Sequence, residues 1–301
     1  MSKAASGEFM NILLEPATVL ELVSEHYDLP QPQSCHFIRR GFNDHYEITA
    51  GETRYIFRVY LNGKYYIESA DAFRFELDLL EYLHEQNVQV AYPLPQKDGT
   101  LLGWTSANSD RRAFALFVYA PGETVEELPS VAQSLELGRT VASLHVAANT
   151  FTSPHERYHL DLEYLVEQPL RLIEQQDDRE MQGTLDALPV DKLVDAVKKF
   201  DASGDQYGII HGDLHPGNLH FQGERVTLFD FDHCAYGWRA YDLATVFSLP
   251  NEQREAFFRG YESLRPLSDE ERALLPVFAQ LRTLWDIGDV LATETLRALP
   301  G

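Results

Sequence analysis

The sequence predicts an α+β fold in which a small, strand-rich N-terminal part is followed by a larger, mostly helical part. Short strand-like segments separated by turn residues dominate residues 35–120. After Gly122 the apolar residues recur at helical spacing over long segments. The chain has 301 residues, of which 44% are hydrophobic and 24% charged, as in a globular protein that buries a sizeable core.

The strand-rich part is predicted to span residues 10–120 and the helical part residues 121–301. Residues 1–9, "MSKAASGEF", resemble an expression-vector leader or a disordered end and are left out of the fold. "CHFIRR" at 35–40, "YEITA" at 46–50 and "YIFRVY" at 55–60 are predicted strands, with turns at "GFNDH" and "GETR".

One main helix is predicted in the strand-rich part. In "SADAFRFELDLLEYLHEQN", residues Phe73, Leu77, Leu80 and Leu83 lie on one helical face. "TLLGW" and "RAFALFVYA" predict two further strands, at 100–104 and 112–120. The helices predicted afterwards cover about 131–148, 160–176, 191–200, 252–264 and 268–298.

The chain is acidic, with a formal net charge of −22. Residues 1–121 carry −6 and residues 122–301 carry −16. DNA and RNA are unsuitable partners because their binding requires Lys and Arg on phosphates. Two interpretations remain open: a solvated acidic surface, or a C-terminal part whose field attracts a cationic substrate.

Membrane and disulfide signals are weak. No uncharged apolar run reaches the roughly 20 residues that cross a bilayer, so no membrane partner is expected. Cys35 and Cys234 are too few for a disulfide framework, and a reducing, cytoplasmic location is expected. The sequence leaves the oligomeric state open.

The segment 211–233, "HGDLHPGNLHFQGERVTLFDFDH", concentrates polar residues that can form one centre. "NLHF" and "RVTLFDF" predict a hairpin around "QGE", which would return Asp230 to the side of Asn218. The preceding loop would deliver Asp213 to the same end. Carboxylate and amide oxygens suit Mg²⁺, and one carboxylate could accept a proton from a hydroxyl.

These residues resemble the aminoglycoside phosphotransferase/choline kinase family, which is related to protein kinases. "HGDLHPGN" is similar to its catalytic loop, and "LFDFDHCAYGWRAYDLA" to its metal-binding segment and the following helix. The ending "GYESLRPLSDEERALLPVFAQLRTLWDIG" looks most like the branch of type II homoserine kinases, hydroxylysine kinases and the stress-response Ser/Thr kinase. The resemblance covers nearly the whole chain after Met10.

The resemblance implies a bilobal protein-kinase-like fold, with a small antiparallel β-sheet N-lobe and a helical C-lobe. It makes Asp213 the catalytic residue, and Asn218 and Asp230 the holders of Mg²⁺ on ATP. His211 is expected to brace the loop rather than act as a base, and Asp242 to support it.

An ATP clamp is expected in the N-lobe. Arg58 in "YIFRVY" and Glu76 on the next helix are the candidate pair, with Arg where protein kinases use Lys. Gly41 and Asn43 in "GFNDH" are candidates for the phosphate-covering turn, although an ordinary β-turn explains them equally well. "LFVYAPG" resembles the connector whose main chain binds adenine, here Phe117, Val118, Tyr119 and Ala120.

Acceptor residues are harder to predict. "LWDIGD" places Trp285, Asp286 and Asp289 on a late helix where an aromatic face and carboxylates suit an ammonium group, although such a Trp is more often core. His215 and Asp232 could contact substrate or a second metal. His145 lies on an apolar helical stripe and is expected in the core, and a zinc site at His215 and His220 is a remote alternative.

Three functions remain at this point. The first is an ATP- and Mg²⁺-dependent kinase for the hydroxyl of a small, amine-bearing acceptor such as homoserine, hydroxylysine, choline or an aminoglycoside. The second is a protein Ser/Thr kinase of the stress-response type. Against it, only the ten residues of "HCAYGWRAYD" separate the metal-binding segment from the next helix, which leaves little platform for a peptide. The third is a non-catalytic nucleotide-binding protein, against which the complete set of Asp213, Asn218 and Asp230 argues.

Overall fold

The computed structural model describes residues 11–31, 34–67, 69–105, 111–125, 128–176, 183, 185–200 and 204–298. The proposed leader at 1–9 lies outside these ranges. The described residues form two compact units. The first contains those of 1–77, 92–119 and α9 from residue 292, and the second those of 78–91 and 120–291.

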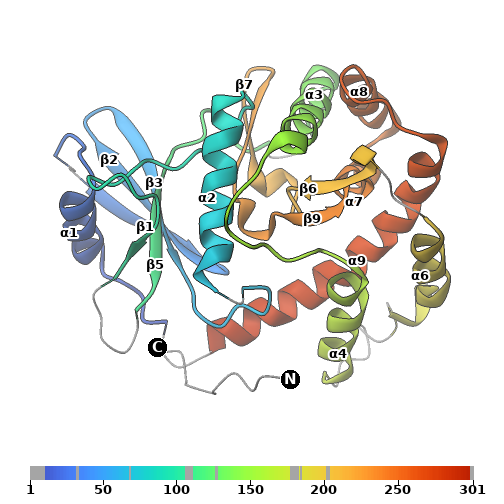
Figure 1. The fold of residues 1–301 in the computed structure, drawn as a ribbon, viewed down its shortest axis with the longest axis horizontal. Helices are drawn as coiled ribbons and strands as arrows, with labels where there is room; N and C mark the ends of the chain where they lie inside the picture. Colours follow the sequence, from blue (N-terminus) through green and yellow to red (C-terminus); the bar gives the residue numbers. More distant parts are fainter. Residues whose placement is uncertain are drawn as a thin grey trace. The chain divides into compact units, whose positions relative to one another are not determined.

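The first unit is built on an antiparallel sheet of five strands in the order β1-β2-β3-β5-β4 (Figure 1). This matches the small antiparallel sheet that the sequence predicts. The strands are β1 Ser34–Arg40, β2 Asn43–Ala50, β3 Thr53–Tyr60, β4 Gly103–Trp104 and β5 Ala113–Val118.

Alternation along β3 explains how this sheet serves two purposes. Phe57 and Val59 are buried in a core shared with helix α1, Pro16–His26. Arg58 lies between them and therefore projects from the opposite face, where Glu76 of helix α2, Ala70–Glu85, meets it.

Helix α1 was not predicted, although Pro16 at its start and Val19, Leu22 and Val23 at helical spacing were a usable signal.

Two predicted strand boundaries differ from the structure. β4 has two residues rather than five, and β2 begins at Asn43, so the turn before it is limited to Gly41 and Phe42. Asn43 pairs with Tyr60 of β3. Asp44 is buried and forms ion pairs with Arg40 at 2.6 Å and Arg112 at 3.0 Å, which holds the strand extended up to the turn.

The second unit is mostly helical. Its helices are α3 Val131–Ala147, α4 Gln168–Glu174, α6 Val190–Lys199, α7 Arg239–Leu243, α8 Asn251–Glu262 and most of α9 Asp269–Ala298. The single helix predicted over 160–176 is interrupted, because Glu163–Glu167 form a π-helical turn before α4. Pro169 has no N–H for the α-helical ladder, which accounts for the irregular turn.

Helices α3 and α8 pack side by side with their backbones unusually close (Figure 1). A Cβ atom on Gly138 of α3 would lie 2.0 Å from the carbonyl oxygen of Phe257, and one on Gly260 of α8 would lie 1.9 Å from that of Leu135. Glycine is therefore required at both positions of the crossing. A capping box of Ser130 and Gln133 starts α3.

Two small β-structures frame the polar segment of the second unit. β6 Tyr207–Ile210 pairs with β9 Ala235–Trp238, and β7 Leu219–Gln222 forms the predicted hairpin with β8 Arg225–Leu228. The loop 211–218 connects β6 to β7. No helix in the described part of the chain is long and apolar enough to span a membrane.

Candidate active site

The loop 211–218 is tied to the helical core by Asp242 of α7. Its carboxylate accepts the backbone N–H of His211 at 2.7 Å and that of Gly212 at 2.9 Å. Gly212 has φ +81°, and a Cβ there would lie 2.1 Å from the carbonyl oxygen of His233. Only glycine permits this turn, which aims the next residue, Asp213.

Asp242 also joins the loop to α3 and α8. His145 of α3 contacts Asp242 through Nε2 at 3.2 Å and Tyr261 of α8 through Nδ1 at 2.8 Å, and all three side chains are buried. Burial lowers the pKa of His145 to about 4, so the ring is neutral. His145 lies in the core, as its place on an apolar stripe predicts.

His211 braces the loop in this geometry. Its Nε2 lies 3.1 Å from the carbonyl oxygen of Phe229, and its Nδ1 lies 3.3 Å from the backbone N of Asp213. The first contact requires a proton on Nε2 and the second a lone pair on Nδ1, which assigns the neutral tautomer. Burial also lowers the pKa of His211. With both nitrogens engaged, His211 is not placed to act as a base.

Asp213 has contacts on both carboxylate oxygens. Oδ2 lies 3.1 Å from Asn218 Nδ2 and 3.4 Å from His215 Nε2, and Oδ1 lies 3.2 Å from Arg282 Nη2. Burial raises the pKa of Asp213, but the hydrogen bond from His215 and nearby positive charges, including Arg282, outweigh it and hold the pKa well below its usual range. Asp213 is therefore a carboxylate at neutral pH.

Asn218 and Asp230 fit a divalent cation by their chemistry. Asn218 is buried, and its Oδ1 has no hydrogen-bond partner among the described residues. Phe229 N–H donates to the carbonyl oxygen of Asn218 at 3.1 Å, so the hairpin returns Asp230 to this region. An amide oxygen and a carboxylate are hard donors of the kind that Mg²⁺ takes alongside water and phosphate.

The backbone of Asp230 is in the left-handed region, with φ 63° and ψ 62°. A non-glycine residue in this region is uncommon and is concentrated at functional sites, and Asp tolerates it better than most. The contacts of the two histidines are different ones: His220 Nδ1 meets the carbonyl oxygen of Ala120 at 2.8 Å, whereas His215 Nε2 meets Asp213. No group of three or more His, Cys, Asp or Glu in the described residues could hold a metal.

A cavity of about 570 Å³ opens beside Asp213 in the second unit. We call it the acidic pocket because Asp213, Asp286 and Asp289 line it, together with Arg282, His215 and Trp285. Trp285 is only 2% exposed and packs on His233 and Tyr241, so it is largely core and forms part of the wall. Asp232, a predicted substrate residue, is buried and absent from this lining as far as the structure describes it.

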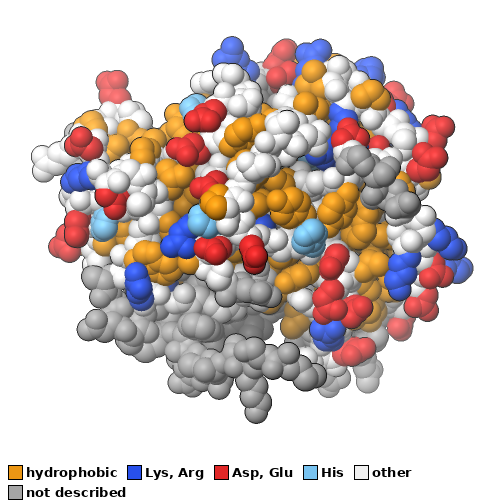
Figure 2. Space-filling model, in the orientation of Figure 1, with side chains coloured by type: hydrophobic (Ala, Val, Ile, Leu, Met, Phe, Trp, Pro, Cys, Tyr) orange, Lys and Arg blue, Asp and Glu red, His pale blue; other side chains and the backbone are white. Residues whose placement is uncertain are grey.

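Acidic side chains are not confined to this pocket. On the face drawn in Figure 2 they occur over the described surface and alternate with Lys and Arg. Part of the net negative charge therefore comes from ordinary solvent-exposed side chains. Recognition of a ligand is better argued from the charges that line the acidic pocket.

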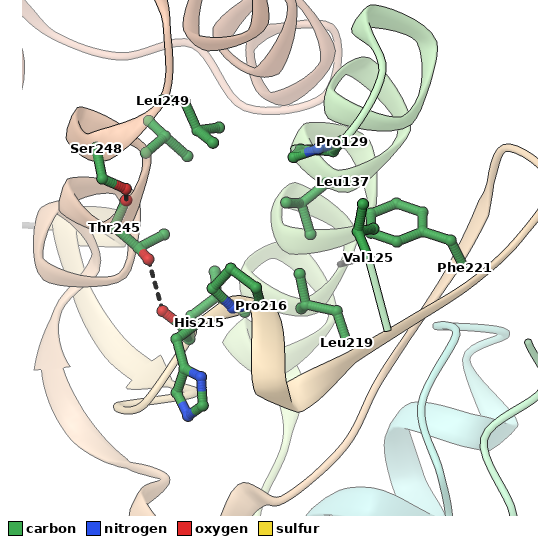
Figure 3. Close-up of a pocket in the computed structure, with 12 residues that line it drawn as sticks. Val125, Pro129, Leu137, His215, Pro216, Leu219, Phe221, Thr245, Ser248 and Leu249 are labelled. Atoms are coloured by element: carbon green, nitrogen blue, oxygen red, sulfur yellow. Dashed lines mark hydrogen bonds between the residues drawn. The ribbon is translucent and has the colours of Figure 1, made fainter. Parts of the chain in front are cut away.

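A separate apolar cavity of about 40 Å³ is lined in part by Leu214, His215 and Pro216 of the loop 211–218 (Figure 3). Leu137, Leu219 and Phe221 contribute to its wall, and Thr245 Oγ1 donates to the carbonyl oxygen of Leu214 at 2.6 Å. The His215 ring points away from this cavity in Figure 3, consistent with its contact with Asp213.

In the first unit, Arg58 and Glu76 form a buried ion pair. Arg58 Nη1 lies 2.5 Å from Glu76 Oε1, and Tyr60 Oη lies 3.4 Å from Glu76 Oε2. The guanidinium also stacks over Phe117, with Cζ 4.6 Å from the ring centroid. Breaking a buried pair of this kind typically costs about 3–5 kcal/mol.

The remaining N-terminal candidates occupy the turn and the connector. A Cβ on Gly41 would meet no atom within 4 Å, so the backbone there is open to approach. Asn43 is buried and its Oδ1 accepts from Lys64 Nζ at 2.6 Å, a contact that sequence patterns could not reveal. Val118 N–H donates to Tyr92 O at 3.0 Å and is therefore not available to adenine.

Phe117 lies in β5, opposite Ile56, with its ring over Arg58. Tyr119 stacks under Arg54, whose Cζ lies 3.7 Å from the ring centroid. Ala120 directs its carbonyl oxygen to His220. These contacts hold the connector, and a role in nucleotide binding stays a prediction for all four residues.

Arg282 is the residue of the site that the sequence did not single out. It lies three and four positions before Trp285 and Asp286 on α9, so helical spacing could have placed it on their face. Its contact with Asp213 joins residues 69 apart in the sequence, and no local pattern predicts that.

Comparison with known proteins supports a phosphotransferase. A family model described as "Phosphotransferase enzyme family" matches residues 34–275. Homoserine kinase of Neisseria meningitidis serogroup B is 30% identical, over 83% of this chain and 80% of its own.

Solved structures agree on the fold. A microcompartment-associated aminopropanol kinase aligns with a TM-score of 0.76 and 26% identity, over 93% of each chain. An amicoumacin kinase in complex with AMP-PNP and Ca²⁺ aligns with a TM-score of 0.75 and 24% identity, over 91% of this chain and 85% of its own. The predicted kinase-like α+β fold is confirmed. This chain belongs to the phosphotransferase enzyme family and transfers phosphoryl groups to a hydroxyl.

Proposed function

We propose that this protein transfers the γ-phosphate of ATP, in the presence of Mg²⁺, to the hydroxyl of a small acceptor that carries an amine. The observation that carries the proposal is the position of Asp213. It lines the acidic pocket and also contacts Asn218, whose Oδ1 is buried without a partner among the described residues. One carboxylate thus connects a cavity for an acceptor with a donor suited to a cation.

The charge of the acidic pocket supports an amine on the acceptor. Three carboxylates line it and one guanidinium offsets them in part, so a cationic ligand is favoured there. Homoserine and aminopropanol, for which two relatives are named, each combine an amine with a hydroxyl. The fold neighbour with AMP-PNP and Ca²⁺ supports a nucleoside triphosphate and a divalent cation as the other reactants.

Asn218 and Asp230 would hold Mg²⁺, which when bound to ATP offsets the negative charge of the phosphates. Arg58, oriented by Glu76, would bind phosphate oxygens through its planar fork. Gly41 would allow the turn backbone to approach them. None of these groups needs to form a covalent bond, so the contribution of the protein is positioning and electrostatic stabilisation.

Asp213 would accept the hydrogen bond of the acceptor hydroxyl and aim its oxygen at the γ-phosphorus. The new bond joins that oxygen to phosphorus, the bond between the γ-phosphorus and the bridging oxygen breaks to release ADP, and the hydroxyl proton passes to Asp213. Because the surrounding cations lower the pKa of Asp213, it is a weak base and its main work is orientation.

The proposal is tested by Mg²⁺-dependent ADP release over pools of hydroxy amino acids, amino alcohols, aminoglycosides, choline analogues and one generic protein acceptor. The Asp213→Asn variant is the blank. We expect one small-molecule pool to stimulate the wild-type protein and not the variant. Stimulation by the protein acceptor alone would contradict the proposal, as would equal rates in the variant.

A further inference from the structure

Arg282 of α9 is directed at the proposed catalytic carboxylate from outside its loop. It is 8% exposed and lies with Nη2 3.2 Å from Asp213 Oδ1. Asn218 and His215, whose side chains also contact this carboxylate, belong to the same loop as Asp213 and both reach Oδ2. Oδ1 is therefore held by an element 69 residues away, and Arg282 fixes the rotation of the carboxylate.

Arg282 is itself well restrained. Its guanidinium lies over the ring of Tyr241, with Cζ 5.6 Å from the centroid, and its Nε lies 3.8 Å from Asp286 Oδ1 one turn further along α9. A planar donor held on a ring face and between two carboxylates has little freedom to rotate. The orientation it imposes on Asp213 is accordingly a fixed one.

The acidic pocket gives this residue a second effect. Arg282 is the only Lys or Arg in the lining of that pocket, as far as the structure describes it, and it lies against the carboxylates of Asp213 and Asp286. Its positive charge reduces the attraction of the pocket for a cationic acceptor while it holds the carboxylate that must receive the hydroxyl. The orientation of Asp213 acts on kcat, whereas the reduced attraction for the acceptor acts on KM.

We propose that Arg282 is a positioning residue that orients Asp213 for phosphoryl transfer at the expense of acceptor affinity. This inference rests on the proposed function. It predicts a specific separation: loss of Arg282 lowers kcat, whereas KM for a cationic acceptor falls. A side chain needed only for the packing of α9 would instead lower Tm and raise KM.

The experiment compares the full-length wild-type protein with Arg282→Met, which removes the charge at similar length, and with Arg282→Lys, which keeps it. 1-Amino-2-propanol is the cationic acceptor probe, and L-homoserine, whose carboxylate cancels the charge of its amine, is the zwitterionic one. The kcat and KM values from ADP release, the Tm and the MgATP affinity are measured for each variant. Arg272→Met is the matched control, because Arg272 lies on the same helix but is exposed and paired with Glu262.

We expect Arg282→Met to lower kcat by about 10- to 100-fold, the range that follows from losing one charged hydrogen bond. Arg282→Lys should recover part of the rate, and MgATP affinity should not change in either variant. An unchanged kcat in a folded Arg282→Met protein, or a rise in KM with kcat intact, would overturn the inference alone. If neither probe is turned over, the small-molecule pool that stimulates the wild-type protein supplies the acceptor, and absence of turnover with every pool would instead overturn the proposed function and this inference with it.

Discussion

Asp213 is the residue on which the proposed chemistry depends most. Replacing it with Asn keeps the volume and the contact with Asn218 but removes the negative charge that accepts the proton. We expect turnover to fall by about 100- to 10,000-fold, because the alignment of the hydroxyl and the acceptance of its proton are both weakened. MgATP affinity, measured by calorimetry, should change little, and near-wild-type turnover would exclude Asp213 as the catalytic residue.

Asp230 is best tested by a substitution that keeps its backbone. Asn tolerates the left-handed region at least as well as Asp, whereas Ala would add strain at φ 63°. Asp230→Asn should weaken Mg²⁺-dependent binding of ATP at least about 10-fold, the effect that loss of even an indirect metal contact produces. Binding of ATP without Mg²⁺ is the control, and equal Mg²⁺ dependence in both proteins would exclude Asp230 as a ligand.

Single residues show what the sequence could and could not predict at the site. The loop and hairpin around Asp213, Asn218 and Asp230 follow from local turn and strand chemistry, so their approach was predictable. Arg282 and Lys64 were not, because their partners lie 69 and 21 residues away and depend on tertiary packing. Asp232 has the residue type of a ligand but its burial depends on neighbours that the local pattern does not specify.

Among the elements, the pair of helices α3 and α8 depends on glycine. In a Gly138→Ala variant the new Cβ would overlap the carbonyl of Phe257, so the helices must separate. We expect a loss of about 3 kcal/mol in the free energy of unfolding, at the upper end of overpacking effects. Denaturant titration measures it, with Gly41→Ala as a control that has open space. Equal stability of the two variants would show that the crossing is not tight.

Element boundaries were predicted less well than element types. The strands β2 and β3 and helix α2 were predicted from periodicity, but the start of β2 is set by the ion pairs of the buried Asp44. The helix predicted over 160–176 ignored the effect of Pro169 on the ladder preceding it. In each case a long-range contact or a missing N–H decided the boundary.

At the scale of the whole molecule, the buried His145 makes stability depend on pH. Its pKa is about 4 in the folded protein and 6.5 when unfolded, so the unfolded chain binds more protons between these values. The stability contributed by the neutral ring is present above pH 6.5 and is lost as pH falls to 4. The free energy of unfolding lost in this way is about 3 kcal/mol. Urea titrations from pH 4 to 7 should show a shallower pH dependence in His145→Asn than in the wild type, and parallel curves would contradict this assignment.

The excess of negative charge after residue 121 should act on association with a cationic acceptor. We expect kcat/KM for such an acceptor to fall about threefold or more when ionic strength rises from about 0.02 M to about 0.5 M, because salt screens the field. A neutral hydroxyl acceptor should show little change and serves as the control. The same salt dependence for both acceptors would show that the charge does not steer substrate.

The carboxylate of Asp242 has a consequence for motion. It holds the amides of His211 and Gly212, while its partner His145 is joined to Tyr261 across the contact of α3 with α8. Both residues are buried, so these amides can meet solvent only if the loop separates from α7 and the packing around it opens. Their hydrogen exchange should therefore follow global unfolding, whereas the amide of Gly217, held by the exposed His215 ring, should exchange through local fluctuation. Within eight residues, the loop that bears the proposed catalytic carboxylate would pass from the slowest to one of the faster exchanging parts of the protein.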